Sequence, residues 1–398
     1  MHLSQHPHRY LFMPHSPNTI EELSECLAGR NSAGNAVAPA SGDTHHYIGA
    51  TLAREAEPLD LSQLAGERFY EPADMVASFS AGTKLSDVQL ALDAENQRLD
   101  IDPGHPDSTL GGALAIDHFG PRCHGWGTLR DKILGLTYVL ADGGIVKVGG
   151  RVMKNVAGYD LNKLMIGSLG TLAVVAEVTF RANPKNDTEG AWLFEFDDLN
   201  AALEAALKVQ GSQLEPVAVV VFDQQAASTI IGSEMVKSAQ LFVAAEGVPP
   251  FVEHHAASLS ELVGTEMTRS IDGTALAAIW SEWHHRLHCR DEAPIVARFG
   301  TRASKCSHLK DLQTSNGLVL YPGRGVGFLN VDDIDSLQEL RQKCEFFGGY
   351  AVVHWSRDQF DAETVWGRPR PDFAVMQRLK QTHDPNGILN PGRFYGGI

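Results

Sequence analysis

The sequence predicts an α+β protein with two regions that differ in how strands and helices alternate. A β-hairpin is the clearest element: the apolar runs 134–140 and 145–148 flank an Ala-Asp-Gly-Gly turn, which has the residues that tight hairpin turns require. A helix is expected to begin at Asn18 or Thr19, because Glu22 lies three residues after Thr19, as in a capping box. From Lys185 onward, short apolar strands alternate with amphipathic helices.

Local signals place the elements of the first region in order. We expect the helix that begins at Asn18 or Thr19 to end at Gly29, because glycine commonly follows the last helical residue. Residues 85–94 carry apolar side chains at helical spacing and predict an amphipathic helix. A short helical stretch is expected at 160–165. Apolar runs predict strands at 35–39, 59–61, 75–80 and 171–180.

The second region has the pattern of a layered α+β unit. Helices are expected at 199–209 and 334–347. This alternation is consistent with ferredoxin-like halves that share a flat sheet, so we interpret the region as a cap domain. A last helix, 372–382, leads back to the first domain. Strands are predicted at 192–196, 217–222, 241–245, 295–299, 318–321, 326–329 and 350–355.

Composition and charge restrict the class of protein. The 398 residues are enough for two domains with cores of their own, and 43% of them are hydrophobic. The net charge of −16 argues against a nucleic-acid-binding protein, whose binding surface would be basic. It suits solubility, and it also suits docking onto a basic face of a partner.

Cysteine usage and apolar runs predict the compartment. The five cysteines are scattered, with no Cys-x-x-Cys spacing, so we expect a reducing cytoplasm and no iron–sulfur cluster within this chain. No apolar run reaches the ~20 residues that a membrane-spanning helix needs. The first ten residues lack the apolar core of a signal peptide.

Two groups of small residues have the pattern of backbone that closely approaches a cofactor. The loop Pro39-Ala-Ser-Gly-Asp-Thr44 follows a strand, where small residues let backbone N–H groups surround a phosphate. The second group is rich in glycine and contains Arg122, which could reach a phosphate. A plain turn and a long surface loop are the alternatives. The second group comprises Gly111, Gly112, Gly120, Gly125 and Gly127.

The segment 152–160, Val-Met-Lys-Asn-Val-Ala-Gly-Tyr-Asp, is the most informative motif, and it follows the β-hairpin. It resembles, almost residue for residue, a segment of the FAD-binding small subunits (E subunits) of bacterial glycolate oxidase. The loops 109–113 and 120–127 are similar to those that lie over FAD in vanillyl-alcohol-oxidase-type flavoproteins, and 128–135 follows in the same order. Residues 383–394 resemble the C-terminal signature of these proteins, whereas about 190–365 match little.

The resemblance implies a PCMH-type (VAO-like) fold, with two subdomains that bind FAD and a ferredoxin-like α+β cap. Residues 1–184 would form the FAD-binding domain, 185–368 the cap that meets substrate or partner, and 369–398 a segment that returns to the first domain. FAD is the implied cofactor, and no metal is expected. The residues implied to bind FAD are Pro39, Ala40, Ser41, Gly42, Asp43, Thr44, Thr109, Gly111, Gly112, Gly120, Arg122, Gly125, Gly127, Lys154, Asn155, Tyr159, Asn390 and Arg393.

The resemblance also implies a function and partners. The chain would be the FAD-binding subunit of a glycolate oxidase (dehydrogenase) complex, together with a homologous catalytic large subunit and an iron–sulfur subunit. It would lie in the cytoplasm, free or associated with the membrane through its partners. Two alternatives stay open: a non-catalytic assembly subunit, and a stand-alone flavin oxidase that acts on another alcohol or 2-hydroxy acid.

The catalytic residues are not evident from the sequence. Oxidation of a hydroxy acid needs a base for the hydroxyl proton and a cation for the carboxylate. His354 and Arg368 are the candidates near the end of the cap. Related dehydrogenases carry a His-x-Gly-Asp-Gly-Asn segment in the cap, and 346–354 lacks it, which points to a catalytic set in the large subunit. His284 and His288 have a spacing that can hold a metal on a helix, but a surface helix is the expected explanation.

Overall fold

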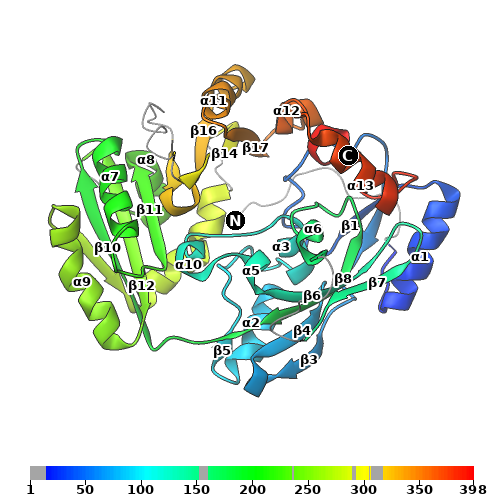
Figure 1. The fold of residues 1–398 in the computed structure, drawn as a ribbon, viewed down its shortest axis with the longest axis horizontal. Helices are drawn as coiled ribbons and strands as arrows, with labels where there is room; N and C mark the ends of the chain where they lie inside the picture. Colours follow the sequence, from blue (N-terminus) through cyan, green and yellow to red (C-terminus); the bar gives the residue numbers. More distant parts are fainter. Residues whose placement is uncertain (1–14, 152–159, 235–236, 289–292, 304, 306–316) are drawn as a thin grey trace.

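The computed structural model describes residues 15–151, 160–234, 237–288, 293–303, 305 and 317–398. Two antiparallel sheets dominate it and lie side by side, as Figure 1 shows. A five-stranded sheet belongs to the first region and an eight-stranded sheet to the cap region, which we define as residues 188–356. The prediction of an α+β protein is therefore confirmed.

The first region surrounds the five-stranded sheet, whose strands lie in the order β3-β4-β8-β6-β7. The expected hairpin is present as β6 and β7, where Gly143 at φ 89° provides the turn. A short parallel pair, β1 and β2, lies beside it. The elements are α1 (Ile20–Ala33), β1 (Val37–Ala40), β2 (Glu57–Asp60), β3 (Glu67–Glu71), η1 (Pro72–Asp74), β4 (Val76–Ser80), α2 (Leu85–Asp93), β5 (Gln97–Arg98), α3 (Leu110–Ala115), α4 (Cys123–Trp126), α5 (Leu129–Lys132), β6 (Ile133–Val139), β7 (Ile145–Gly149), α6 (Asn162–Met165), β8 (Val174–Arg181) and β9 (Asn183–Pro184).

The cap region is one continuous sheet in the order β13-β10-β12-β11-β15-β16-β14-β17. The junction between β11 and β15 joins its two halves. The elements from here to the C-terminus are β10 (Thr188–Phe196), α7 (Leu199–Gln210), β11 (Ala218–Asp223), α8 (Gln224–Ile231), β12 (Ala239–Gly247), α9 (Pro249–Val263), β13 (Arg269–Asp272), α10 (Gly273–His288), β14 (Ile295–Gly300), β15 (Val319–Tyr321), η3 (Pro322–Arg324), β16 (Val326–Val331), α11 (Ile334–Phe346), β17 (Tyr350–Ser356), α12 (Ala362–Trp366), α13 (Phe373–His383) and η4 (Tyr395–Gly397).

Two apolar cores cover the two faces of the cap sheet. Helices α7, α9, α11 and α12 bury one face. Helices α8 and α10 cover part of the other face, and Trp126 of the first region packs into that same core. The first region therefore docks on the α10 face of the cap sheet, and side chains on this face meet side chains of the first region.

The expected end of the first helix is wrong. Helix α1 continues through Gly29 to Ala33, and Gly34 at φ 70° is the residue that ends it. Leu23 and Leu27 are fully buried, so packing of the helix outweighs the modest cost of an internal glycine. Helices α8 and α9 were not expected, because their apolar residues lie among many polar ones; of α10, only a helix around His284 and His288 was expected.

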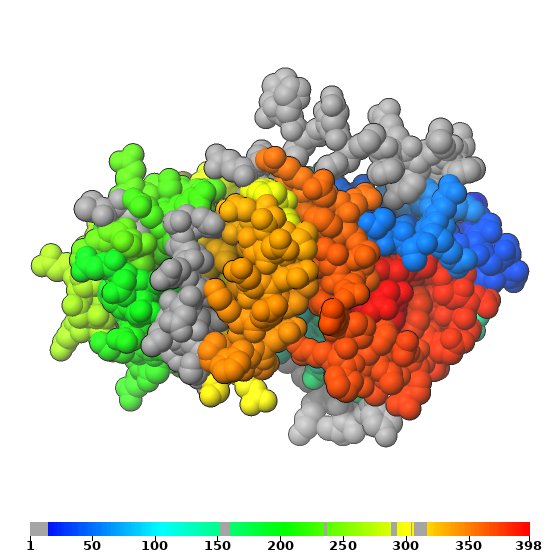
Figure 2. All heavy atoms as spheres, turned by 90° about the horizontal axis from the view of Figure 1, so that it is seen from above, coloured from blue at the N-terminus to red at the C-terminus, as the bar shows by residue number. Residues whose placement is uncertain are grey.

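The C-terminal segment lies against the start of the chain. Leu389 bridges to Val37, and the Asn390 N–H donates to the Val37 carbonyl over 3.0 Å. Figure 2 shows the red C-terminal residues packed beside the blue N-terminal ones. In the described part of the chain, no helix combines the length and the apolar character that crossing a bilayer needs.

Candidate active site at the domain interface

Hydroxyl groups join the first predicted loop to the start of α3. The Ser41 and Thr109 hydroxyls are 2.7 Å apart, and the Thr44 and Ser108 hydroxyls are 3.1 Å apart. Thr109 is also the N-cap of α3 and accepts the Gly112 N–H. The sequence predicted both loops separately, and the structure brings them together.

The glycines of these loops have different neighbours. A Cβ on Gly42 would lie 1.8 Å from the Asp107 carbonyl oxygen, and one on Gly111 would lie 2.8 Å from the Ala81 Cβ. Both glycines therefore allow chain segments to pack together. A Cβ on Gly112 would meet only the Thr109 hydroxyl at 3.2 Å and the His45 ring at 4.0 Å, so this glycine leaves its side of the loop open.

The hydroxyl-lined loop fits the phosphates of FAD. Hydroxyl and backbone N–H donors suit a pyrophosphate, and Gly112 leaves room for a close approach of the backbone. Asp43, whose charge would oppose phosphate, has a side chain that is 63% exposed and lies 3.8 Å from His46. Pro39 and Ala40 end β1 below this loop.

Three glycines of the second group, Gly120, Gly125 and Gly127, pack against other segments of the chain. Cβ atoms on Gly120, Gly125 and Gly127 would lie within 2.5–2.8 Å of Asp102, Val217 and Asp131 respectively. The Gly125 N–H also donates to the Val217 carbonyl across the domain interface, over 3.0 Å. These three glycines therefore permit close contacts between chain segments in this structure, and their expected approach to a flat cofactor stays a prediction.

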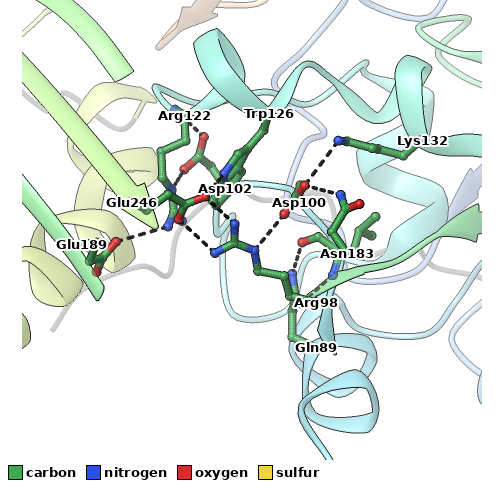
Figure 3. A network of polar contacts seen from close by, with 11 residues as sticks. Gln89, Arg98, Asp100, Asp102, Arg122, Trp126, Lys132, Asn183, Glu189 and Glu246 are labelled. Carbon is green, nitrogen blue, oxygen red and sulfur yellow. Dashed lines mark hydrogen bonds and ion pairs between the residues drawn. The ribbon is translucent and has the colours of Figure 1, made fainter. Parts of the chain in front are cut away.

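Arg122 belongs to a buried polar network between the two regions (Figure 3). Its guanidinium donates to Asp102 over 2.7 Å and lies between the rings of Trp126 and Trp280, 4.0 Å and 4.8 Å from their centroids. In this arrangement the guanidinium is not free to bind a phosphate. The expected cofactor contact of Arg122 is replaced by a contact that holds the cap in place.

Arg98 makes the second connection across this interface. It donates to both carboxylate oxygens of Glu246 on β12, and Trp126 donates its indole N–H to the same carboxylate. Asp100 accepts from Arg98 over 2.8 Å and also pairs with Lys132. These charged groups are buried and paired with each other, as Figure 3 shows, so they hold the cap to the first region.

The C-terminal candidates support neighbouring loops. Asn390 donates to the Leu169 carbonyl over 2.8 Å, and Arg393 donates to the His46 carbonyl over 2.6 Å. Both contacts hold loops that flank the hydroxyl-lined loop. Lys154, Asn155 and Tyr159, which the resemblance implied, lie outside the described residues.

Four histidines meet where the first region contacts the cap. His45 and His118 come from the first region, His284 from α10 and His354 from β17. The centroids of the His118 and His284 rings are 5.2 Å apart, and His45 lies 5.6 Å from His284. Tyr47 connects His354 to this group, with centroids 6.1 Å apart. No three metal-binding side chains within the described residues are arranged to hold an ion.

Burial favours the neutral form of three of these histidines, His45, His118 and His354. Desolvation, with help from the nearby His118, lowers the pKa of His45 to about 3. Desolvation also lowers the pKa of His118, and it lowers the pKa of His354 well below its usual value, with Arg298 adding to the effect. Neutral imidazoles can accept or donate one hydrogen bond each. His45 Nδ1 lies 2.9 Å from the Thr44 hydroxyl, while Nε2 is buried without a partner among the described residues.

An arginine and an aspartate complete the site from opposite sides. Arg298 on β14 is paired in register with Phe328, so it shares the sheet face that meets the first region. Phe328 packs on His354, with centroids 5.0 Å apart. Asp117 belongs to the first region. Burial raises the pKa of its carboxyl group, and the positive charge of Arg298 opposes this increase. Arg298 Nε and Asp117 Oδ1 are both buried without a hydrogen-bond partner in the described part of the chain.

The structure corrects two expectations about the site. Arg368 is 91% exposed and pairs with Glu363, so it lies outside the histidine group, whereas His354 lies within it. His284 does not belong to a surface helix face: it is buried, because α10 packs between the cap sheet and the first region.

Sequence reasoning missed Asp117, His118 and Arg298 as site residues. The available signal was a lone polar residue in an apolar strand, as with Arg298 in 295–300 and His354 in 350–356. That signal does not say whether the residue faces solvent, an ion pair or another domain.

Comparisons with known proteins identify the family. Residues 15–149 match the FAD binding domain family, and residues 363–394 match the C-terminal domain of FAD linked oxidases. Glycolate oxidase subunit GlcD of Bacillus subtilis is 30% identical over 367 residues, which cover 81% of this chain and 76% of that protein. The chain belongs to the FAD-linked oxidases. It is an FAD-dependent oxidoreductase of the PCMH type, and FAD is its cofactor.

A further relative agrees with this family, and a solved structure agrees with its fold. Glycolate oxidase subunit GlcE of Escherichia coli is 27% identical over 350 residues, which cover 86% of this chain and 88% of that protein. A solved alkyldihydroxyacetonephosphate synthase has the same fold, with a TM-score of 0.68 at 18% identity over 94% of this chain and 76% of that one. The PCMH-type fold that the resemblance implied is therefore confirmed.

Proposed function

We propose that this FAD-linked oxidase is a subunit of a glycolate oxidase (dehydrogenase) complex and oxidises glycolate or a closely related small 2-hydroxy acid to the 2-oxo acid. FAD, when bound, supplies the acceptor for a hydride. Electrons then leave through an iron–sulfur partner, because this chain has no cysteine pair at the spacing of a cluster site. The large-subunit and iron–sulfur partners are part of this proposal.

One observation carries the proposal: unsatisfied polar atoms of complementary kind are buried on both sides of the domain interface, and Arg298 of the cap acts electrostatically on Asp117 of the first region. Arg298 Nε–H is a buried donor, and Asp117 Oδ1 and His45 Nε2 are buried atoms able to accept. A 2-hydroxy acid has the matching groups, since its carboxylate accepts and its hydroxyl donates. Buried polar atoms without partners are costly, so they mark a place that a ligand completes. The site therefore supports oxidation within this chain.

The binding residues follow from the same geometry. We assign the FAD phosphates to Ser41, Thr44, Thr109 and the backbone around Gly112, and the substrate carboxylate to Arg298. Residues 1–184 and 369–398 would hold FAD, and 185–368 would close over it as the cap. His354, beside Arg298, would orient the substrate.

Substrate binding and flavin bleaching test this function. Flavin-loaded protein, alone and co-purified with its partners, would be mixed anaerobically with glycolate or D-lactate, and oxalate binding would be measured by calorimetry. Arg298→Met should weaken oxalate binding by about 10- to 100-fold, since hydrogen bonds to charged groups contribute ~1.5–3 kcal/mol. Arg368→Met is the matched control and should bind normally, because Arg368 lies at the surface.

Two results would contradict the proposal. One is flavin that stays oxidised with both hydroxy acids, with and without partners. The other is an Arg298→Met protein that binds oxalate as well as the wild type.

A further inference from the structure

Asp117 has a backbone conformation that aspartate seldom adopts. It follows α3 at φ 52°, in the left-handed region. Its N–H donates to the Leu114 carbonyl, and the His118 N–H donates to the Ala113 carbonyl. This pattern is the helix-ending motif in which glycine is the usual residue at the left-handed position. The aspartate at this position therefore has a strained backbone conformation. Residues with strained backbone conformations concentrate at functional sites.

The Asp117 carboxyl group is placed to meet a ligand. Its Oδ1 is buried and makes no hydrogen bond to any described residue. The segment that carries it packs on the loop 167–169, where the Gly167 N–H donates to Leu114 and the Leu169 N–H to Ala115. Across the interface lies Arg298, which we assign to the substrate carboxylate. The charged or titratable groups around Asp117 are Arg130, Arg298, Arg324, Asp131, His118 and Cys123.

The pKa of Asp117 is also shifted in the direction opposite to the pKa values of its histidine neighbours. Burial raises the pKa of Asp117, although Arg298, Arg324 and Arg130 oppose the increase. Burial has the opposite effect on imidazole, because the charged form of histidine is the protonated one. It lowers the pKa of His45 to about 3 and that of His354 well below its usual value. Burial therefore makes the Asp117 carboxylate a stronger base and the imidazoles of His45 and His354 weaker bases, which suits Asp117 to accept a proton from a bound hydroxyl.

We propose that Asp117 is the catalytic base that takes the hydroxyl proton of the substrate, an inference that rests on the proposed oxidation of a 2-hydroxy acid. The O–H bond breaks and its proton joins the Asp117 carboxylate. The C2–H bond breaks, and FAD, when bound, would supply the two-electron oxidant that accepts this hydrogen as hydride. The C2–O bond becomes a carbonyl, so a hydroxy acid becomes a 2-oxo acid. Arg298 holds the substrate carboxylate throughout.

Two substitutions of Asp117 separate chemistry from folding. Asp117→Asn keeps the shape and tolerates the left-handed conformation, and Asp117→Gly relaxes the backbone there. Both variants should retain flavin, and Asp117→Gly should melt at the same or a higher temperature than the wild type. Both should slow anaerobic flavin bleaching by glycolate by about 10²–10⁴-fold, the usual contribution of a general base. His354→Gln is the comparison for a neighbouring group that orients the substrate and leaves the base in place.

The pH dependence is the second readout. The wild-type bleaching rate should rise as the pH increases through the pKa of Asp117, and both variants should lose this rise. Oxalate has no hydroxyl group and is not oxidised, so its affinity tests whether the Asp117 carboxyl group lies close to the bound anion. Its binding to the wild type, measured by calorimetry, should weaken over the same pH range, because the ionised carboxylate repels the anion. Binding to Asp117→Asn should not change there.

Each outcome decides the inference. A slow Asp117→Asn enzyme with a flat pH profile and pH-independent oxalate binding supports it. If the flavin of Asp117→Asn bleaches at a rate within about threefold of the wild-type rate, the inference is refuted and the proposed oxidation stands. A change of about threefold is far below the usual contribution of a general base. Slowing of His354→Gln with loss of the pH profile, when Asp117→Asn keeps it, assigns the base to His354 instead. If glycolate and D-lactate fail to bleach the wild type, both the proposed function and this inference fall.

Discussion

The buried Arg98–Glu246 contact gives the most direct test of how the cap is held. Glu246 has a side chain that is only 5% exposed, and it accepts from both Arg98 and the Trp126 indole. Glu246→Leu keeps similar volume but removes every acceptor, which leaves Arg98 paired only with Asp100 and leaves the indole N–H unsatisfied. Removing one partner of a buried ion pair typically costs about 3–5 kcal/mol.

The expected effect is large enough for calorimetry. At ~2–4 °C per kcal/mol for domains of this size, the substitution should lower the melting midpoint by about 6–20 °C. Because the lost contacts join the two regions, we also expect the unfolding transition to split into two. The flavin should remain bound at low temperature, since the hydroxyl-lined loop is separate from this contact.

A surface ion pair in the cap provides the control. Asp197 pairs with Lys237 over 3.2 Å, and its side chain is 85% exposed. Asp197→Leu should cost less than about 1 kcal/mol, as exposed pairs do. The reasoning would be refuted by a Glu246→Leu protein that unfolds in one transition within about 2 °C of the wild type, a shift worth less than about 1 kcal/mol.

Two further predictions concern acid stability and the hydroxyl-lined loop. The pKa of His45 is about 3 in the folded chain and ~6.5 when unfolded, so only the unfolded state gains the proton as pH falls below ~6.5, and stability should drop by ~1.4 kcal/mol per pH unit. Chemical denaturation at pH 7 and 5.5 should show a smaller loss for His45→Asn; an equal loss would exclude His45 as a cause. Gly42→Ala should lower flavin content and melting temperature, because its Cβ would lie 1.8 Å from the Asp107 carbonyl oxygen. Gly29→Ala is the control, since its Cβ would meet nothing within 4 Å; equal behaviour of the two variants would contradict the packing argument.

The two kinds of contact at the domain interface have different consequences. The network around Arg98 and Arg122 is fully paired, so it orders the cap relative to the first region. The group around Asp117 and Arg298 keeps buried polar atoms without partners among the described residues. The first arrangement stabilises the docked cap, and this allows the second to remain unsatisfied until a ligand binds.

Local chemistry was sufficient for many elements. The hairpin of β6 and β7 follows from its turn residues, and the strands of the cap other than β13 follow from apolar runs of strand length. The resemblance of 152–160 led to the family, the fold and FAD before any contact was known. These features were accessible because neighbouring residues, or a short contiguous motif, carry the whole signal.

Only the tertiary structure decided what the site residues contact. His45, Asp117, Arg298 and His354 come from four separate segments, and each alone is a common polar residue beside apolar ones. The same limit explains Arg122, which suited a phosphate by its glycine-rich surroundings but lies between two tryptophans and Asp102. The sequence by itself determined many of the elements, and the resemblance of a short motif indicated the cofactor, because turn chemistry, periodicity and motifs are local. Which side chains meet depends on the docking of the cap sheet on the first region, and that packing depends on contacts between residues far apart in the chain.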